Sequence, residues 1–474
     1  MPGVRPWGLL LLLLMSPLAR AQDAHYWTRQ FGNRAWLLGG AFISNPGDIS
    51  AVYYNPGALA LLRTPELELT GTVFESTSLT VQNGQGNGQG LTESRIDVLP
   101  SLIAGSLRWG FLGKSRLAYS LLTRQGFTAS LESREQGAGT NLGGVPGMDQ
   151  LAADVRLDQD VGEYWAGLTW SFPLGKHVGV GVSPFAAVRD QETNIQVLAQ
   201  GSGPGGSALL STLGRDFHLR HVRLLAKLGV SYQREHLSAG LTVTTPSVAL
   251  WGEGESSFER AILERGFGLS SLPASAFDFQ EGLEARFQSS WAVALGVGGT
   301  LGSTSVYLAA EGFARVKPFT LVDAKPFSPR DSQEVIDPDV DFALAPLVNV
   351  ALGVEQRLGS RLRAYLSAHT DFSGVTETPN MNALLSGWDL YHVATGLHFT
   401  VGRSRFTLGG NVAFGQQSTE RLADAVERAG LQPLSASQKV RFLQLSLIIG
   451  ASFALVEKDQ SPDEDTADEA PTMR

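Results

Sequence analysis

Apolar and polar residues alternate with a period of two along most of the chain. The clearest case lies near the C-terminus, where every second residue from Leu443 to Phe453 is apolar and the residues between them are polar or small, apart from Ile448. The alternation recurs at residues 348–355 and 362–369. Successive side chains of a strand point to opposite faces of a sheet, and segments of about ten residues with this alternation are typical of strands that cross a membrane within a closed barrel. The pattern therefore predicts an all-β, membrane-spanning protein.

Fourteen segments of the chain fit this description. They lie near residues 65–81, 96–109, 115–131, 156–172, 177–192, 216–232, 237–251, 283–299, 303–316, 342–357, 361–373, 388–401, 403–416 and 439–455. Six short turns alternate with seven long loops between them. Bacterial barrels join an even number of strands by short periplasmic turns and longer outer loops. We therefore expect a 14-stranded antiparallel transmembrane β-barrel with both termini in the periplasm.

Aromatic residues stand at the ends of several apolar stripes, among them Trp170, Phe172, Tyr232 and Trp291. A soluble β-sandwich also alternates, but it gives no reason for aromatic residues at these positions. Girdles of aromatic residues mark both interfaces of a membrane barrel. The ends of the stripes therefore favour the barrel.

The first 21 residues have the pattern of a secretory signal peptide. Arg5 precedes an apolar run from Leu9 to Met15, and the small residues Ala19 and Ala21 stand before the expected cleavage site. This run is far shorter than the roughly 20 residues that a membrane-spanning helix needs, and no run of that length follows it. We therefore expect export, and a helical membrane protein is excluded.

Composition narrows the possible chemistry further. The chain has no cysteine, so a disulfide, a thiol site and a zinc-thiolate site are excluded, and we expect no metal or other cofactor. The net charge of −9 comes largely from residues 457–469, which hold seven acidic residues and one lysine, and about −3 remains without them. No basic surface points to nucleic acid. Residues 456–474 are expected to form a disordered acidic tail.

Between the signal peptide and the first strand, residues 22–62 do not alternate. They include the glycine pair Gly39-Gly40 and the sequence Asn55-Pro56-Gly57. Paired glycines permit close backbone packing and positive φ, and a proline keeps the residue before it extended. A barrel of this strand number has a lumen too wide for side chains alone to fill. These features suit a compact plug inside the barrel, and the alternative is an ordinary N-terminal loop that caps a core.

This segment resembles the N-terminal hatch of the FadL family of outer-membrane transporters of long-chain fatty acids and aromatic hydrocarbons. Arg34-Ala35, Gly39-Gly40-Ala41-Phe42, Asp48 and Asn55-Pro56 match the family's motifs, whereas Gly57 stands where the family usually has alanine. The resemblance implies a hatch over residues 22–62 and a barrel over residues 63–455. It also implies a monomer in the outer membrane of a Gram-negative cell that takes up a hydrophobic small-molecule ligand, contacts outer-membrane lipids and is inserted by the barrel assembly machinery.

In that family, the ligand first meets an apolar groove in the outer loops. Here the loop at residues 251–272 contains Phe258, Ile262 and Leu263 at helical spacing, followed by Phe267. Gly266 is placed to end the expected helix, and a second helical loop is expected at residues 420–429. The apolar face of the first helix is either a ligand groove or a surface that packs against a neighbouring loop.

The resemblance further implies a pocket inside the barrel and a sideways exit at a kink in the third strand. Strand parity places His221, Arg223 and Lys227 in the lumen, and Arg363 points inward from another strand. A buried cation there suits the carboxylate of a fatty acid, although lumen charges also pair with one another or with the hatch. Gly126 is the candidate for the kink.

Other functions remain open from the sequence. Ser367, His369 and Asp371 share one face of a strand, but neighbours on that face lie about 7 Å apart, whereas a nucleophile and its base need hydrogen-bond reach. We therefore expect no enzyme, and a lipid-modifying barrel is the weakest alternative. The others are a FadL-like barrel of a protein secretion system and a porin for polar solutes.

Overall fold

The structure is a computed structural model that describes residues 25–44, 47–62, 66–82, 90–107, 113–138, 149–266, 275–330, 333–374, 388–419 and 438–454. The expected signal peptide and acidic tail lie outside these residues, as do Phe267 and the expected helix at residues 420–429. In the described ranges, no helix is long and apolar enough to cross a membrane.

The strands form one antiparallel sheet that closes on itself, because β1 pairs with both β2 and β18. The strands are β1 (Glu66–Gln82), β2 (Gly90–Leu107), β3 (Arg116–Ala138), β4 (Gln150–Leu174), β5 (Val178–Ser202), β6 (Ala208–Arg234), β7 (Leu237–Thr244), β8 (Val248–Arg265), β9 (Ser275–Ala285), β10 (Ala292–Leu301), β11 (Thr304–Phe313), β12 (Val316–Asp323), β13 (Val340–Leu344), β14 (Leu347–Arg357), β15 (Leu362–Asp371), β16 (Leu390–Val401), β17 (Ser404–Thr419) and β18 (Gln438–Ala454). Four barrel strands are interrupted, so that β7 and β8, β9 and β10, β11 and β12, and β13 and β14 are each two parts of one strand. The eighteen segments therefore make the 14-stranded barrel that the alternation predicts.

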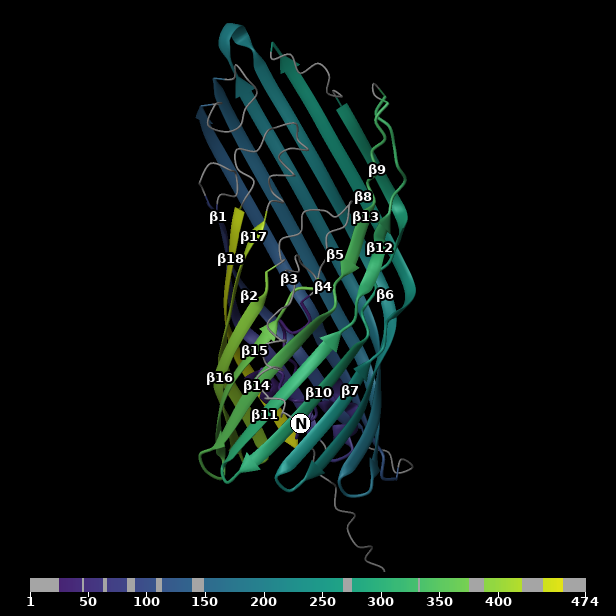
Figure 1. The fold of residues 1–474 in the computed structure, drawn as a ribbon, viewed down its shortest axis with the longest axis vertical. Helices are drawn as coiled ribbons and strands as arrows, with labels where there is room; N and C mark the ends of the chain where they lie inside the picture. The colour runs from purple at the N-terminus through teal and green to yellow at the C-terminus, as the bar shows by residue number, and fades with distance from the viewer. Residues whose placement is uncertain are drawn as a thin grey trace, which may run out of the picture.

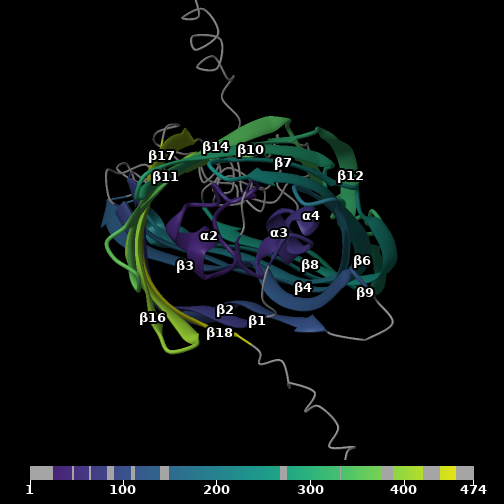
Figure 2. The ribbon, with the colours of Figure 1, turned by 90° about the horizontal axis from the view of Figure 1, so that it is seen from below.

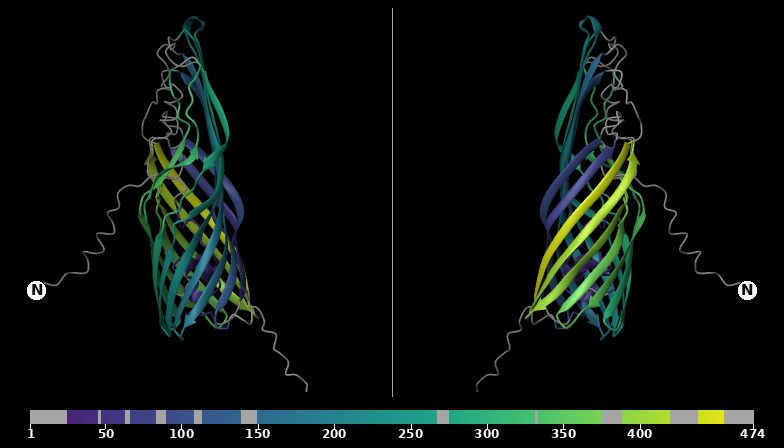
Figure 3. Two further views of the ribbon diagram at one scale, coloured as in Figure 1. Left: turned by 90° about the vertical axis from the view of Figure 1, so that its right-hand side faces the viewer. Right: turned by 90° about the vertical axis from the view of Figure 1, so that its left-hand side faces the viewer.

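The barrel wall is much taller on one side than on the other (Figures 1 and 3). Strand β5 has 25 residues and β6 has 27, with the short helix η3 (Pro204–Gly206) between them, whereas β10 and β15 have 10 each. The tight turns between β6 and β7, β10 and β11, and β16 and β17 lie at the opposite end, where β1 begins and β18 ends. We call this the short-turn end, and it is the lower end in Figure 1.

The two faces of the wall follow the alternation in the sequence. In β18, the side chains of Leu445 and Ile449 are about half exposed on the outside, while Gln444 is buried inside. Ile448, the exception in the pattern, is fully buried and belongs to an apolar cluster that includes Leu37 of the N-terminal segment. The exception therefore marks a position where the wall meets what fills the lumen.

The N-terminal segment is a plug inside the barrel. Its helices α2 (Asn33–Leu37), α3 (Ala51–Tyr54) and α4 (Pro56–Leu59) lie within the ring of strands in Figure 2. Its apolar side chains form one buried cluster with inward-facing residues of the wall. We call the described residues 25–44 and 47–62 the hatch.

Asn55 fixes the last part of the hatch. Its side-chain Oδ1 accepts a hydrogen bond from the N–H of Gly57 at 3.1 Å, which caps α4, and Pro56 takes the first helical position. The Nδ2 of Asn55 donates to the carbonyl oxygens of Ile43, at 2.9 Å, and Val230, at 3.0 Å. One amide side chain thus ties α4 to the preceding hatch segment and to β6.

Gly57 lies directly against the backbone of the wall. A Cβ atom at this position would be 2.5 Å from the oxygen of Gly179 and 2.6 Å from that of Gly229, so no larger residue fits without movement. Wall glycines of eight strands, from β5 round to β18, make such close contacts with the hatch. They are Gly179, Gly181, Gly229, Gly240, Gly296, Gly353, Gly396, Gly409 and Gly450, which we call the glycine belt.

An ion pair holds the hatch to the other side of the barrel. Nη2 of Arg34 donates to Glu355 at 2.6 Å, and the same carboxylate accepts from Nη1 of Arg363 at 2.7 Å. Gly39 and Gly40, with φ of 59° and 80°, form the turn that follows α2. The motif residues of the sequence thus serve to seat and fold the hatch.

The expected loop helix is wrong. Residues 248–265 form strand β8, which pairs with β6 along nearly its whole length. Phe258 and Ile262 share a face, because residues four apart lie on the same face of a strand as well as of a helix. Leu263, however, lies on the opposite face and is 63% exposed. The three residues therefore form no common apolar groove.

Candidate functional site

The ladder between β2 and β3 is much shorter than either strand. It joins residues 102–107 to residues 117–122, although β2 has 18 residues and β3 has 23. Where it stops, each strand carries an extra residue, Ser101 in β2 and Arg124 in β3. Extra residues of this kind bend a strand and end its pairing, and Pro100 has no N–H to donate. Among the described strands, the wall is therefore interrupted between β2 and β3.

Arg124 points from the bend in β3 into the lumen. Its residue is 7% exposed, and its guanidinium carbon lies 5.7 Å from the ring centre of Trp165. Within the described residues, this guanidinium makes no hydrogen bond and no ion pair. A buried charge without a partner is costly, so this residue is suited to bind an anion that enters the lumen.

A cavity of about 50 Å³ lies between the hatch and the wall at this height. Arg124 and Gln125 line it from the bend in β3, and Tyr26 and Tyr53 line it from the hatch. Burial raises the pKa of both tyrosines to about 12, so they remain neutral. The apolar part of the lining comes from Trp165, Leu225, Phe287, Ala292, Phe313 and Leu344.

A network of buried charges surrounds the cavity. Glu163 accepts a hydrogen bond from Arg223 at 2.6 Å and one from Arg189 at 3.1 Å. Lys227 lies 3.8 Å from the carboxylate of Glu311.

These charges do not balance. Of the lining residues, Arg124, Arg223 and Lys227 are cations and Glu163 and Glu311 are anions, which leaves one positive charge. Beyond the lining, Arg189 is bound to Glu163, and the buried anion Asp371 acts on Arg124. The cavity thus combines apolar walls with an excess of positive charge, an arrangement that fits a ligand with an apolar body and an anionic head.

The wall opposite the β2–β3 gap is also irregular. The four interrupted strands break at one level, because Thr244, Ala292, Phe313 and Leu347 are successive neighbours across the sheet. Residues 286–291 lie between β9 and β10, and the ring of Phe287 in this segment faces two guanidinium groups. Arg189 lies 4.0 Å and Arg223 4.8 Å from its centre.

The first residues of the hatch are hydrogen-bonded to the bend in β3. Arg29 donates to the carbonyl oxygen of Gly126 at 3.0 Å, and Gln125 donates to that of His25 at 3.2 Å. Arg189 in turn donates to Gln125 at 2.8 Å. The bend, the hatch and the charged network are therefore one connected unit.

The lumen residues chosen from strand parity have different roles. Arg223 and Lys227 line the cavity. His221 is fully buried beside them but does not line it. Arg363 pairs with Glu355, the wall carboxylate that also binds Arg34 of the hatch. Arg124 was missed from the sequence, because the extra residue in β3 interrupts the alternation there.

The residues that suggest a hydrolase triad make other contacts in the structure. Asp371 accepts the backbone N–H groups of Tyr26 and Trp27 at 3.0 and 2.8 Å, so it anchors the hatch. The ring of His369 stacks on that of His392, with centroids 4.2 Å apart. Among the described residues, neither Ser367 Oγ nor the His369 nitrogens have a hydrogen-bond partner. No nucleophile and base are paired.

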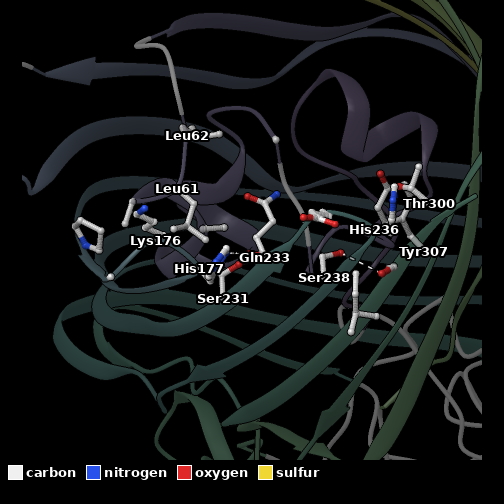
Figure 4. Close-up of a pocket in the computed structure, with 18 of the residues that line it drawn as sticks. Leu61, Leu62, Lys176, His177, Ser231, Gln233, His236, Ser238, Thr300 and Tyr307 are labelled. Atoms are coloured by element: carbon white, nitrogen blue, oxygen red, sulfur yellow. Dashed lines mark hydrogen bonds between the residues drawn. The ribbon is translucent and has the colours of Figure 1, made fainter. Parts of the chain in front are cut away.

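A second and larger pocket, of about 840 Å³, opens at the short-turn end. Figure 4 shows Leu61 and Leu62 of the hatch on one side of it, and Lys176, His177 and His236 among the wall residues around it. Its lining is mostly polar, and Glu235 is its one acidic residue among those described.

No family model matches the sequence, and no curated protein matches it. Solved structures do match the fold. A FadL homologue of Pseudomonas aeruginosa has a TM-score of 0.58 and 11% identity, over 91% of this chain and all of that one. The toluene transporter TodX of Pseudomonas putida has a TM-score of 0.57 and 13% identity, over 90% of this chain and 99% of that one. The monoaromatic hydrocarbon channel CymD has a TM-score of 0.53 and 11% identity, over 90% of this chain and 98% of that one.

Proposed function

From the fold that this chain shares with the FadL-type channels of outer membranes, we propose that it admits hydrophobic small molecules through an outer membrane by diffusion. The observation that carries the proposal is the cavity beside the interrupted β2–β3 ladder, where the guanidinium of Arg124 makes no hydrogen bond or ion pair among the described residues. A ligand held there leaves sideways between β2 and β3 into the membrane. It does not have to pass the hatch.

The charge of the cavity favours one ligand class. The one excess positive charge of its lining suits an amphiphile with a carboxylate, such as a long-chain fatty acid, better than a neutral aromatic hydrocarbon. The apolar rings of Trp165 and Phe313 suit the chain of such a ligand. The cavity is smaller than the roughly 150 Å³ that holds a benzene molecule, so binding requires the surrounding side chains or the first hatch residues to move.

The alternatives fit less well. A porin for polar solutes needs an open lumen, whereas the hatch fills the lower lumen of this barrel. A secretion channel must pass a polypeptide, for which a cavity of about 50 Å³ is far too small.

The proposal is tested by the affinity of the purified protein for a fluorescent long-chain fatty acid and for the corresponding alcohol. A hydrogen bond to a charged group is worth about 1.5 to 3 kcal/mol, so Arg124→Gln is expected to weaken binding of the acid roughly tenfold to hundredfold. Binding of the alcohol stays nearly unchanged. The matched control is Arg220→Gln, because Arg220 is 63% exposed on the outside and pairs with Asp190.

Two results would contradict the proposal. If neither compound binds the wild-type protein, the uptake of hydrophobic molecules is refuted. If both compounds bind and Arg124→Gln weakens them equally, the preference for an acid is refuted while the channel remains.

A further inference from the structure

The short-turn end of the barrel is strongly basic. The described turns at this end and the strand residues beside them include eight Lys and Arg residues, against the acidic residues Glu66 and Glu235. We call the basic ones the basic rim, and they are Lys114, Arg116, Lys176, Arg234, Arg357, Arg361, Arg403 and Arg405. Six of them are exposed. The histidines His177 and His236 stand among them.

The rim surrounds a recess. Arg116, Lys176 and Arg405 line the pocket of about 840 Å³, together with His177 and His236. The hatch helix α4 and the residues after it form its inner side (Figure 4). A pocket of this volume lies within the range that binds ligands, about 300 to 1,000 Å³. Because its basic groups outnumber its acidic ones, the pocket is suited to bind an acidic group.

The chain itself supplies such an occupant. Strand β18 ends at the short-turn end, where the N–H of Ala454 lies 3.5 Å from the carbonyl oxygen of Arg403. The sequence that follows holds seven acidic residues and one lysine between Glu457 and Glu469. Fifteen residues extend up to roughly 50 Å, so this segment reaches the pocket from its point of attachment.

We propose that the acidic segment 457–469 binds the basic rim and the pocket at the short-turn end of the same barrel. Attachment through β18 raises the local concentration of the segment to about the millimolar range, which favours it over a free anion. Anionic lipid head groups would meet the rim from outside the barrel, whereas the pocket is inside the ring of turns beneath the hatch. This proposal does not depend on the ligand that the channel carries.

The absence of native cysteine allows a direct test, because the introduced pair then supplies the only thiols in the protein. The pair Thr300→Cys and Thr466→Cys places one thiol in the pocket and one in the acidic segment without removing a charge. The control pair is Ser303→Cys and Thr466→Cys, since Ser303 is exposed at the same end of the barrel and within reach of the segment, but lies outside the pocket. Both are oxidised in neutral detergent and followed on non-reducing gels.

We expect the pocket pair to cross-link about tenfold faster than the control pair, a ratio that corresponds to about 1.4 kcal/mol of attraction. Salt at about 1 M shortens the screening length to about 3 Å and should remove the difference. Changing the seven acidic residues to their amides should remove it as well.

Four results would overturn the proposal. They are equal rates for the two pairs, a rate that does not respond to salt or to the amide variant, a cross-linked dimer in place of the monomer, and loss of the cross-link in nanodiscs that contain phosphatidylglycerol. The third would show that a second copy donates the segment. The fourth would show that the rim binds lipid instead.

Discussion

Gly57 offers the sharpest test of how the hatch is seated. In Gly57→Ala the new methyl group would lie 2.5 Å from the carbonyl oxygen of Gly179, against an ordinary contact of at least 3.4 Å, so α4 has to retreat by about 0.9 Å. A shift of that size stretches the hydrogen bonds from Asn55 to Ile43 and Val230, now 2.9 and 3.0 Å, beyond bonding distance. Overpacking of this kind costs about 1 to 3 kcal/mol.

The expected result is a loosened hatch in an intact barrel. Single-channel conductance in a planar bilayer should rise, and the thermal transition of the hatch, followed through the fluorescence of Trp27 and Trp36, should move down. Gly359→Ala is the matched control, because a Cβ at this turn position meets open space. If Gly57→Ala behaves like Gly359→Ala in both assays, the backbone contact between hatch and wall does not exist as described.

Two further predictions concern the barrel. Leu447→Arg places a charge on the lipid-facing side, so it should lower the stability of the folded barrel by about 2 to 4 kcal/mol and impair assembly. Ser446→Arg, on the lumen side, should have a milder effect. Equal losses of folded protein on gels would refute the assigned faces. A thiol-reactive label on a cysteine placed at Gly205 should react in intact cells, and one at Lys176 should not, since these residues lie at opposite ends of the barrel; the reverse accessibility would invert the topology.

The period of two was enough to predict the barrel, because the lipid requires apolar side chains on one face of each strand and the lumen accepts polar or small ones on the other. It failed where a strand leaves the membrane. Strand β8 lies in the tall part of the wall, where no lipid imposes an apolar face, and Phe258 and Ile262 then fit a helix as well as a strand. The long pairing with β6 decides the structure there, and it joins residues that are distant in the sequence, so the local pattern does not indicate it.

The site itself was predicted only in part. Arg223 and Lys227 follow from parity, because β6 is regular at these positions. Arg124 does not, because Leu122, Thr123 and Arg124 are all buried and alternation is lost across them. Two of the four strand interruptions had a signal in the sequence, since Pro246 and Pro346 lie within them. That Arg124 makes no hydrogen bond or ion pair within the described part of the chain depends on how the lumen is packed, and no pattern in the sequence indicates it.

The sequence also contains a partial signal for the glycine belt. Its members stand at inward positions and at the level of the hatch, so they mark the height at which the hatch fills the lumen and leaves no room for wall side chains. Glycine content by itself, however, does not separate these residues from the glycines of the turns. Parity and height have to be known first.

The short β2–β3 ladder has a consequence for the membrane around the protein. Six paired residues extend about 20 Å along the strands, or about 15 Å along the membrane normal at the usual tilt, whereas the apolar band of such barrels is about 25 Å tall. Unpaired backbone groups are not tolerated in hydrocarbon. The bilayer is therefore expected to thin on this side of the barrel, so that lipid head groups and water reach the unpaired strand edges. A ligand that leaves the barrel here would enter a locally thinned leaflet.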